Sequence, residues 1–319
     1  MKKVIKIIGA GQLGSRHLQA LKSVSIPLKI EVIDAFQGSL DTAKERYESI
    51  PGFEYHELEY SLELKSSEDT DVAIIATNAD VRKQVIEDLL NSTRVKNLII
   101  EKIMFNEPEE YAVIEALLIK HQVNAWVNCP MRMMPSYQNI HEMLESSPIN
   151  YRVTGGAFGL MTNAIHYLDH VAHLSACDAF SLDLSGLSPE LIPSKRKSFY
   201  EITGRLTAIF SDGSRCEMIE ELNSQAPVLI EIFNQNHRYI IRENQRLAWY
   251  SGELNNWQWS EIQFDILFQS QMTGLVVEKI LQENQCDLTP FASSKKIHLQ
   301  LLNPIQNFEK FQEEEFLFT

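Results

Sequence analysis

The sequence predicts an α/β fold: an N-terminal domain built on a doubly wound parallel sheet, then an α+β domain with a large, mostly antiparallel open sheet. Three observations predict it. Short apolar stretches alternate with helical patterns up to residue 127, glycines separate the first stretch from the first helix, and strand-like stretches dominate the second half. A chain of 319 residues also exceeds one ordinary core. We place the two domains at residues 1–128 and 129–319.

A strand, a glycine-rich turn and a helix open the chain. Residues 4–8 are apolar and β-branched except for Lys6, which fits a short strand buried on both faces. Gly9 permits a tight turn, Gly11 lets the backbone approach a pyrophosphate, and Gly14 lets the following helix pack closely on the strand. This pattern predicts a Rossmann dinucleotide-binding unit with the phosphates at the helix N-terminus. The predicted cofactor-binding residues of the turn are Gly9, Gly11, Gln12, Leu13 and Gly14.

A second strand, over 28–33, ends in Asp34. A carboxylate about 20 residues beyond the last glycine accepts hydrogen bonds from the adenosine ribose and repels a 2′-phosphate. Asp34 therefore favours NAD over NADP. The alternative is that Asp34 is a loop acid or a helix cap.

Strands and helices continue to alternate up to residue 127. The pattern predicts strands over 71–77, 98–102 and 123–127, and helices over 81–90 and 111–121. Ligands of such sheets bind beyond the carboxyl ends of the strands. Besides the glycine turn and Asp34, that rule selects Thr77, Asn78, Glu101, Lys102 and Asn128.

The pattern changes after about residue 130. Asp212-Gly213 is a hairpin signal between two strand-like stretches. We predict helices over 163–174 and 261–282 and beyond residue 294. The strand-like stretches are 151–160, 200–210, 215–222, 228–233, 239–242 and 248–250.

Composition excludes several function classes. The net charge of −14, from 29 basic and 43 acidic residues, argues against a nucleic-acid-binding face. No apolar stretch reaches the roughly 20 residues of a membrane span, so we expect a cytoplasmic protein with no membrane partner. The four cysteines are widely spaced and predict neither a zinc site nor a disulfide framework.

The order of motifs resembles the Gfo/Idh/MocA oxidoreductases, the relatives of glucose–fructose oxidoreductase and inositol dehydrogenase. The resemblance covers most of the chain. It implies an NAD(P)-dependent oxidoreductase acting on CH–OH groups, which transfers a hydride between the nicotinamide and a hydroxyl or keto group of a sugar, cyclitol or nucleotide-sugar. The motifs are Gly11-Gln-Leu-Gly-Ser-Arg-His-Leu18, Glu101-Lys102, Asn128-x-x-x-Arg132, His166-x-x-Asp169 and the 288–298 tail.

The resemblance implies that Lys102 lies beside the nicotinamide and contacts the reacting hydroxyl. A partly desolvated lysine beside a cationic ring loses its proton more readily, which suits proton transfer. The alternatives are a solvated lysine or a pair with Glu101, and strand alternation disfavours that pair. Ile103 replaces the proline that follows this lysine in the family.

The same resemblance implies a second group of catalytic and substrate-binding residues on the 163–174 helix. His166 is the second catalytic residue, and Asn163 joins it. Thr162 stands where many members carry an aspartate, and a threonine can form hydrogen bonds but cannot hold a negative charge at neutral pH. His166 and His170 could suggest a metal site, but a third ligand is missing, and we predict no metal. The predicted substrate-binding residues are Arg132, Thr162 and Asp169, and for Arg132 a surface ion pair is the alternative.

Three functions stay open on the sequence alone. The first is the sugar or cyclitol dehydrogenase, and the second is a non-catalytic NAD-binding sensor or partner subunit with the same fold. The third is a reductase or lyase that uses bound NAD transiently. In each case the open sheet of the second domain needs a cover, because exposed apolar sheet faces are usually interfaces. We therefore expect a homodimer or homotetramer formed through that sheet.

Overall fold

This computed structural model describes residues 2–65, 69–311 and 317–318. It divides into two compact units, of which the first is Met1–Asn128 with Leu267–Ala292 and the second is Cys129–Ile266 with Ser293–Thr319.

One late segment departs from the domains predicted at 1–128 and 129–319. Helix α7 (Gln269–Glu283) packs against α1 (Gly14–Leu21) in the first unit. A Cβ on Gly274 would lie 2.7 Å from the carbonyl oxygen of Ala20, so the missing side chain permits the close approach of the two helices. Such tertiary packing leaves no signal in the local sequence pattern.

The first unit contains a seven-stranded sheet in the order β17-β6-β5-β4-β1-β2-β3. Its strands are parallel except β17, which is antiparallel to β6 at the edge. The central strands are buried on both faces, which explains their continuous apolar runs. Their bounds are β1 (Lys3–Ile8), β2 (Leu28–Ile33), β3 (Glu57–Ser61), β4 (Thr70–Ile75), β5 (Val95–Ile100), β6 (Asn124–Val127) and β17 (Thr289–Pro290).

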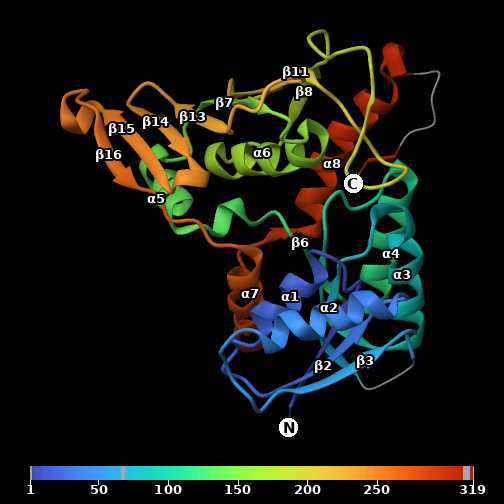
Figure 1. Ribbon diagram of the computed structural model, residues 1–319. Helices are drawn as coiled ribbons and strands as arrows, with labels where there is room; N and C mark the ends of the chain where they lie inside the picture. Colours follow the sequence, from blue (N-terminus) through green and yellow to red (C-terminus); the bar gives the residue numbers. More distant parts are fainter. Residues whose placement is uncertain (1, 66–68, 312–316, 319) are drawn as a thin grey trace. The chain divides into compact units, whose positions relative to one another are not determined.

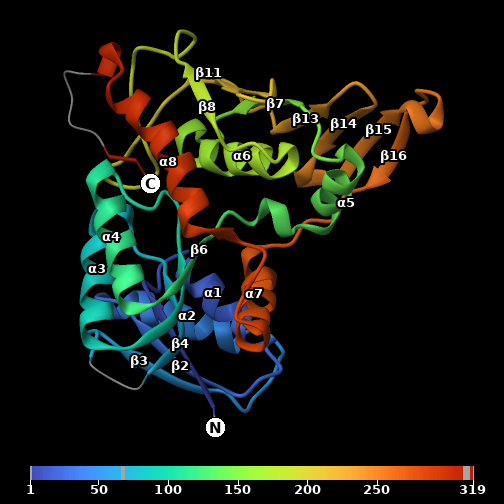
Figure 2. The same cartoon turned by 180° about the vertical axis from the view of Figure 1, so that it is seen from behind.

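Helices cover the sheet of the first unit in two groups. Helix α1 contacts α2 (Gln37–Glu48) and α7, whereas α3 (Ala79–Ser92) contacts α4 (Pro108–His121). Figure 1 shows α3 and α4 side by side, and Figure 2 shows α7 beside α1. The predicted doubly wound Rossmann unit is confirmed.

The second unit contains an eight-stranded sheet in the order β16-β15-β14-β13-β7-β12-β11-β8. Only the β7–β12 pair is parallel among the described pairings, so the predicted mostly antiparallel sheet is confirmed. The strands are β7 (Asn150–Gly156), β8 (Phe180–Asp183), β11 (Gly204–Phe210), β12 (Arg215–Glu221), β13 (Leu229–Phe233), β14 (His237–Arg242), β15 (Leu247–Gly252) and β16 (Ser260–Gln263).

The helices of the second unit are α5 (Pro135–Leu144), α6 (Leu160–Ser175) and most of α8 (Phe291–Gln306). Helix α6 packs on β12 and on α5. Figure 1 shows α6 running along one face of the sheet. Helix α6 begins three residues before the helix predicted over 163–174. Helix α5 has no counterpart among the predicted elements. Short 3₁₀ helices lie at Pro130–Met133, Glu243–Gln245, Glu253–Asn255 and Glu309–Phe311.

Two expected elements are wrong. The helix predicted over 261–282 starts only with α7, because β16 pairs with β15 and places Ile262 opposite Ala248. The strand predicted over 200–210 is divided in two. Its first part, β10 (Tyr200–Glu201), pairs with β9 (Ile192–Pro193), and Gly204 begins β11 at a φ of +95°.

None of the described helices is both long and apolar enough to cross a bilayer. The four cysteines all lie within the described residues, and no disulfide joins them. The cytoplasmic location is a separate question and stays a prediction.

Candidate functional site

The glycine turn between β1 and α1 requires its glycines for two different reasons. Gly9 has a φ of +93°, and a Cβ there would lie 2.7 Å from the carbonyl carbon of Ala76. A Cβ on Gly14 would lie 1.7 Å from the carbonyl oxygen of Gly9. A Cβ on Gly11, by contrast, would meet no described atom within 4 Å. The turn is therefore tightly packed on its inner side and open at Gly11, where a phosphate can approach.

Asp34, at the end of β2, is bound to this turn. Its Oδ2 accepts a 2.7 Å hydrogen bond from the Ala10 N–H, and its Oδ1 accepts a 2.9 Å bond from the Phe36 N–H. A carboxylate has about four acceptor positions, so these bonds leave capacity for a ribose hydroxyl. On the helix side, Arg46 donates from Nη2 to Gln12 Oε1 at 2.7 Å. The described side chains thus fix both ends of the turn.

A pocket of about 570 Å³ opens beside the turn, at the carboxyl ends of β1, β2 and β4. Its described lining includes the acids Asp34 and Asp88 and no lysine or arginine. The Oγ1 atom of Thr77, another lining residue, is buried and lacks a hydrogen-bond partner among the described residues. An open glycine turn, an acid at the end of β2 and an unpaired hydroxyl together fit a dinucleotide. Asn78, which precedes α3, also lines this pocket.

Glu101 and Lys102 follow β5 at the same edge of the sheet. The Glu101 side chain is 2% exposed and accepts hydrogen bonds from His17 Nε2 at 2.9 Å and Asn128 Nδ2 at 2.5 Å. Burial raises the pKa of Glu101, but the hydrogen bond and charge of His17, the charge of Lys102 and the Asn128 bond outweigh it, so the pKa is lowered. Lys102 is half-buried, and the Lys102–Ile103 peptide bond is cis. Glu101 is therefore an internal anion.

In the second unit, Thr162 lies at the N-terminus of α6 beside the carboxylate of Glu201. The Thr162 hydroxyl donates to Glu201 Oε1, and Oε2 accepts from the N–H groups of Met161 at 2.9 Å and Thr162 at 3.2 Å. Asn163 Nδ2 donates to the carbonyl oxygens of Phe158 (2.6 Å) and Gly159 (3.1 Å). A carboxylate thus lies next to the position where the family resemblance expects an aspartate.

Asp169 and Arg132 bind each other. Arg132 donates from Nη2 to Oδ1 at 2.9 Å and from Nε to Oδ2 at 3.2 Å, and the Asp169 side chain is 1% exposed. This geometry corresponds to the ion-pair alternative for Arg132, although the pair is internal and not on the surface. Its described contacts tie the Pro130–Met133 turn to α6.

The three histidines of α6 that follow Asn163 have different surroundings. His166 is half-buried, whereas His170 is buried and contacts the hydroxyl of Tyr151 at 3.1 Å. Burial lowers the pKa of His170 well below its usual range, with smaller contributions from neighbouring positive groups. His173 stacks on His141. The described part of the chain holds no group of three or more His, Cys, Asp or Glu side chains that could bind a metal.

Three buried residues with contacts at these sites have no place among the predictions. Glu201 and Arg82 contact the predicted site segments from elements distant in sequence. Glu220, 3% exposed, has a pKa raised by burial and by the nearby charge of Glu201. Arg82 falls within a predicted helix, but nothing in its local pattern marks it as buried. Such residues are recognised only from the structure, which shows that their charged side chains are buried.

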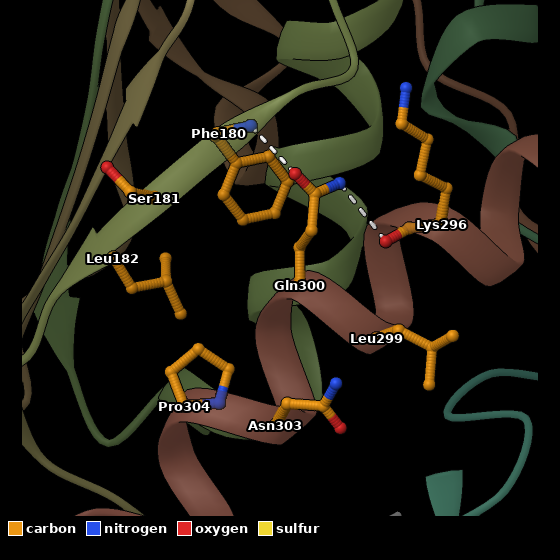
Figure 3. A pocket seen from close by; sticks show the side chains of 8 residues that line it. All are labelled: Phe180, Ser181, Leu182, Lys296, Leu299, Gln300, Asn303 and Pro304. Carbon is orange, nitrogen blue, oxygen red and sulfur yellow. Dashed lines mark hydrogen bonds between the residues drawn. The ribbon is translucent and has the colours of Figure 1, made fainter. Parts of the chain in front are cut away.

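A second pocket, of about 610 Å³, lies between β8 and α8 in the second unit (Figure 3). Its lining contains none of the predicted site residues. Gln300 is one of its lining residues. Its Oε1 accepts from the Phe180 N–H at 2.8 Å, and its Nε2 donates to the Lys296 carbonyl oxygen at 3.1 Å. The side chain thereby satisfies the N–H of an edge strand.

Comparison with known families gives a match over the N-terminal part of the chain. Residues 3–129 match the Gfo/Idh/MocA family model, described as an oxidoreductase family with an NAD-binding Rossmann fold. Over these residues the match confirms the family resemblance predicted from the motifs. No curated protein matches the chain.

Several solved structures share the fold over nearly the whole chain. An oxidoreductase from Agrobacterium radiobacter in complex with NAD+, L-tartaric acid and magnesium is 14% identical, with a TM-score of 0.73 and 94% of each chain covered. UDP-N-acetylglucosamine 3-dehydrogenase GnnA from Acidithiobacillus ferrooxidans is 11% identical, with a TM-score of 0.70 and 95% of this chain and 96% of that chain covered. A mutant of KijD10, a 3-ketoreductase from Actinomadura kijaniata in complex with TDP-benzene and NADP, is 11% identical, with a TM-score of 0.71 and the same coverage.

Proposed function

We propose that the protein transfers a hydride between a nicotinamide cofactor and a hydroxyl or keto group of a sugar, cyclitol or nucleotide-sugar, because residues 3–129 match the model of the Gfo/Idh/MocA oxidoreductase family. The observation that carries the proposal is the position of Lys102, which follows β5 at the edge of the sheet that also holds the glycine turn. The names of GnnA and KijD10 favour the nucleotide-sugar among these substrates.

In this proposal Lys102 takes the proton of the substrate hydroxyl when an alcohol is oxidised and returns it in the opposite direction. The bound nicotinamide supplies the hydride acceptor or donor. His166 and Asn163 stay the proposed second catalytic group, and Thr162 stays a proposed substrate contact. For Asp169 and Arg132, the mutual ion pair favours a positioning role over direct contact with the substrate.

We propose NAD as the preferred cofactor. A 2′-phosphate carries negative charge, and the acids Asp34 and Asp88 would repel it. No basic residue among the described lining offsets this repulsion. Calorimetric titration checks the preference: NAD should bind at least about 10-fold more tightly than NADP, equivalent to about 1.4 kcal/mol. Equal affinities would contradict it.

The function itself is tested on a panel of polyols, sugars and nucleotide-sugars, with NAD and the absorbance of the reduced nicotinamide as the readout. Turnover with one member should fall by about 10²–10⁴-fold in Lys102→Ala, the usual contribution of general acid–base catalysis. Lys120→Ala, which removes an exposed lysine of α4, is the matched control and should leave turnover unchanged. Unchanged turnover in Lys102→Ala would exclude the proposed role.

A non-catalytic NAD-binding protein is the second candidate, and Thr162 favours it because a threonine cannot carry the negative charge of an aspartate. This candidate predicts tight NAD binding and no turnover on the whole panel. The Glu201 carboxylate beside Thr162 favours the enzyme, because it restores an acid at this position. Bond cleavage without net NADH would instead support the lyase type of reaction.

We further propose that a second copy of the chain covers the open face of the second unit. On that face Arg152 is paired with Glu217 at 2.8 Å and Glu231 at 3.8 Å, and by strand alternation Phe233 and Ile209 lie on the same side. Phe233 and Ile209 are exposed in the single chain. A monomer at micromolar concentration in sedimentation velocity would contradict this proposal.

A further inference from the structure

One buried arginine binds the main chain of two loops at the carboxyl edge of the sheet in the first unit. Arg82, near the start of α3, is 1% exposed. Its Nη1 donates to the carbonyl oxygens of Glu101 at 2.7 Å, Ile103, and Met104 at 3.0 Å. Its Nη2 donates to the carbonyl oxygen of Thr77. A guanidinium carries five N–H groups in one plane, so a single rigid group holds the carbonyl oxygens of both loops.

The loop after β4 forms part of the wall of the pocket beside the glycine turn. Thr77 and Asn78 line this pocket, together with Val81 of α3. The described lining contains none of residues 101–106. A nucleotide in this pocket therefore contacts one of the two loops that Arg82 holds and does not contact the other.

The loop after β5 is a buried segment with one side chain that is only half-buried. Residues 101 and 103–106 are buried, whereas Lys102 is half-buried. Arg82 binds the carbonyl oxygens on both sides of Lys102. Farther along, the hydroxyl of Tyr111 in α4 donates to the Phe105 carbonyl oxygen at 2.9 Å, and the two rings pack edge to face. The position of the main chain that carries Lys102 therefore depends on where Arg82 lies.

The strand ladder fixes only the beginnings of the two loops. The pairing of β4 with β5 ends at Ile75 and Ile100, and the Glu101 N–H then donates to the Ile75 carbonyl oxygen at 3.0 Å. Past this bond, the guanidinium of Arg82 links the two loops. Carbonyl oxygens carry partial negative charge, so the three that converge on Nη1 repel one another unless a cation lies between them. The arrangement of the loops thus requires both the charge and the planar shape of the arginine.

We propose that Arg82 is a positioning residue that couples the two loops, so that a nucleotide which fills the pocket and restrains Thr77 also restrains the main chain around Lys102. This inference rests on the proposed function, because it assigns how the nucleotide site and the proposed acid–base residue are held in place together. ADP is a suitable probe of the coupling, since it carries the adenosine and two phosphates of the dinucleotide without the nicotinamide.

Hydrogen exchange followed by mass spectrometry tests the coupling without a substrate. In the wild type, ADP should slow amide exchange by about 3-fold or more in both 76–80 and 101–106, because local opening of each loop becomes rarer. In Arg82→Met, ADP should still slow exchange in 76–80, whereas 101–106 should exchange equally fast with and without ADP. Calorimetric titration of each variant sets the ADP concentration, so that the pocket is equally filled in all of them.

Two further variants make the outcome unambiguous. Lys83→Met removes the neighbouring cation of α3, which pairs with Glu87 on the helix surface at 3.9 Å, and should keep the wild-type response to ADP. Arg82→Lys keeps the charge without the planar group, so the response of 101–106 should fall to about half or less. It also serves as the test if Arg82→Met does not fold.

An arginine that merely stabilises the fold gives a different result. Its replacement would lower the melting temperature and leave the response of 101–106 to ADP intact. That result in a folded Arg82 variant would overturn the proposal. A wild-type protein in which bound ADP leaves the exchange of 101–106 unchanged would overturn it as well.

Binding and turnover separate this inference from the proposed function. If calorimetry shows no ADP binding, the nucleotide site fails and this inference fails with it. If ADP binds and nothing on the panel is turned over, the proposed hydride transfer fails, whereas hydrogen exchange still decides the role of Arg82. If the panel yields a substrate, Arg82→Lys should lower kcat by about 10-fold or more and change KM by less than about 3-fold, because a misplaced catalytic group slows the reaction more than it weakens binding.

Discussion

The N-termini of α1 and α6 begin in similar ways and differ in what they present. Both helices follow a strand through a glycine-containing turn. At α1 the space above Gly11 is open, and the nearest carboxylate, Asp34, binds the turn from the side. At α6 the carboxylate of Glu201 already occupies the N–H groups of Met161 and Thr162. Since helix N-termini attract anions, the first is available to a ligand phosphate and the second holds an anion of the chain itself.

The comparison shows that the N-terminus of a helix that follows a strand is not by itself a ligand site. What separates the two cases is whether another part of the chain supplies the anion. Four substitutions test this comparison, in addition to Lys102→Ala above.

The largest effect on stability is expected from Arg132→Met, which removes the cation from the internal pair that holds α6. Asp169 would then be a buried charge without its arginine, and such losses cost about 3–5 kcal/mol. Urea unfolding measures the change. Arg94→Met, which removes an arginine that is 75% exposed from a surface pair with Asp69, is the control and should cost less than about 1 kcal/mol. Equal losses of unfolding free energy in the two variants would contradict the expectation that the internal Arg132–Asp169 pair stabilises the protein more than a surface pair does.

Gly14→Ala should come next, because its Cβ would overlap the Gly9 carbonyl oxygen. Overpacking of this kind costs about 1–3 kcal/mol, and NAD binding should weaken along with stability. Gly11→Ala meets no described atom, so it should unfold like the wild type and still bind NAD more weakly. A Gly11→Ala variant with normal NAD affinity would show that the phosphates bind elsewhere.

The smallest effect is expected from Glu220→Gln in β12, the strand on which α6 packs. The pKa of Glu220 is raised in the folded protein, mainly by burial and then by Glu201. Because the pKa of Glu220 is higher in the folded than in the unfolded protein, the group stabilises the fold at pH values below its unfolded pKa. This stability is lost as the pH rises through its folded pKa. The variant escapes this loss, so its melting temperature should exceed that of wild type by about 2 °C at neutral pH and by less near pH 4.5.

A control separates this effect from a general loss of surface charge. Glu221→Gln removes the adjacent exposed carboxylate and should show no such pH-dependent difference. A Glu220→Gln variant with the same advantage at both pH values would show that ionisation is not the cause.

The sequence predicts those parts of the molecule whose signals are contiguous. β1, the glycine turn, α1, β2 and Asp34 lie within the first 34 residues, so their spacing alone indicates a nucleotide site. The partners of Glu101 lie far from it in sequence, His17 on α1 and Asn128 just after β6, and Asn128 is bound in turn by Gln269 of α7. No local pattern joins these residues. Glu201 escapes prediction for a related reason: it lies in a two-residue strand, 39 positions from Thr162.

The position of α7 also has a consequence for the order of events during synthesis. The ribosome releases the glycine turn and the first six strands of the sheet long before Gln269 and Thr273 exist. Until α7 emerges, His17 lacks its partner Thr273 and Asn128 lacks its partner Gln269, and the α1 surface that Gly274 will cover stays exposed. The nucleotide-binding unit is therefore encoded first and completed late, and a ribosome that stalls after residue 128 leaves a nascent chain that exposes apolar surface to chaperones and proteases.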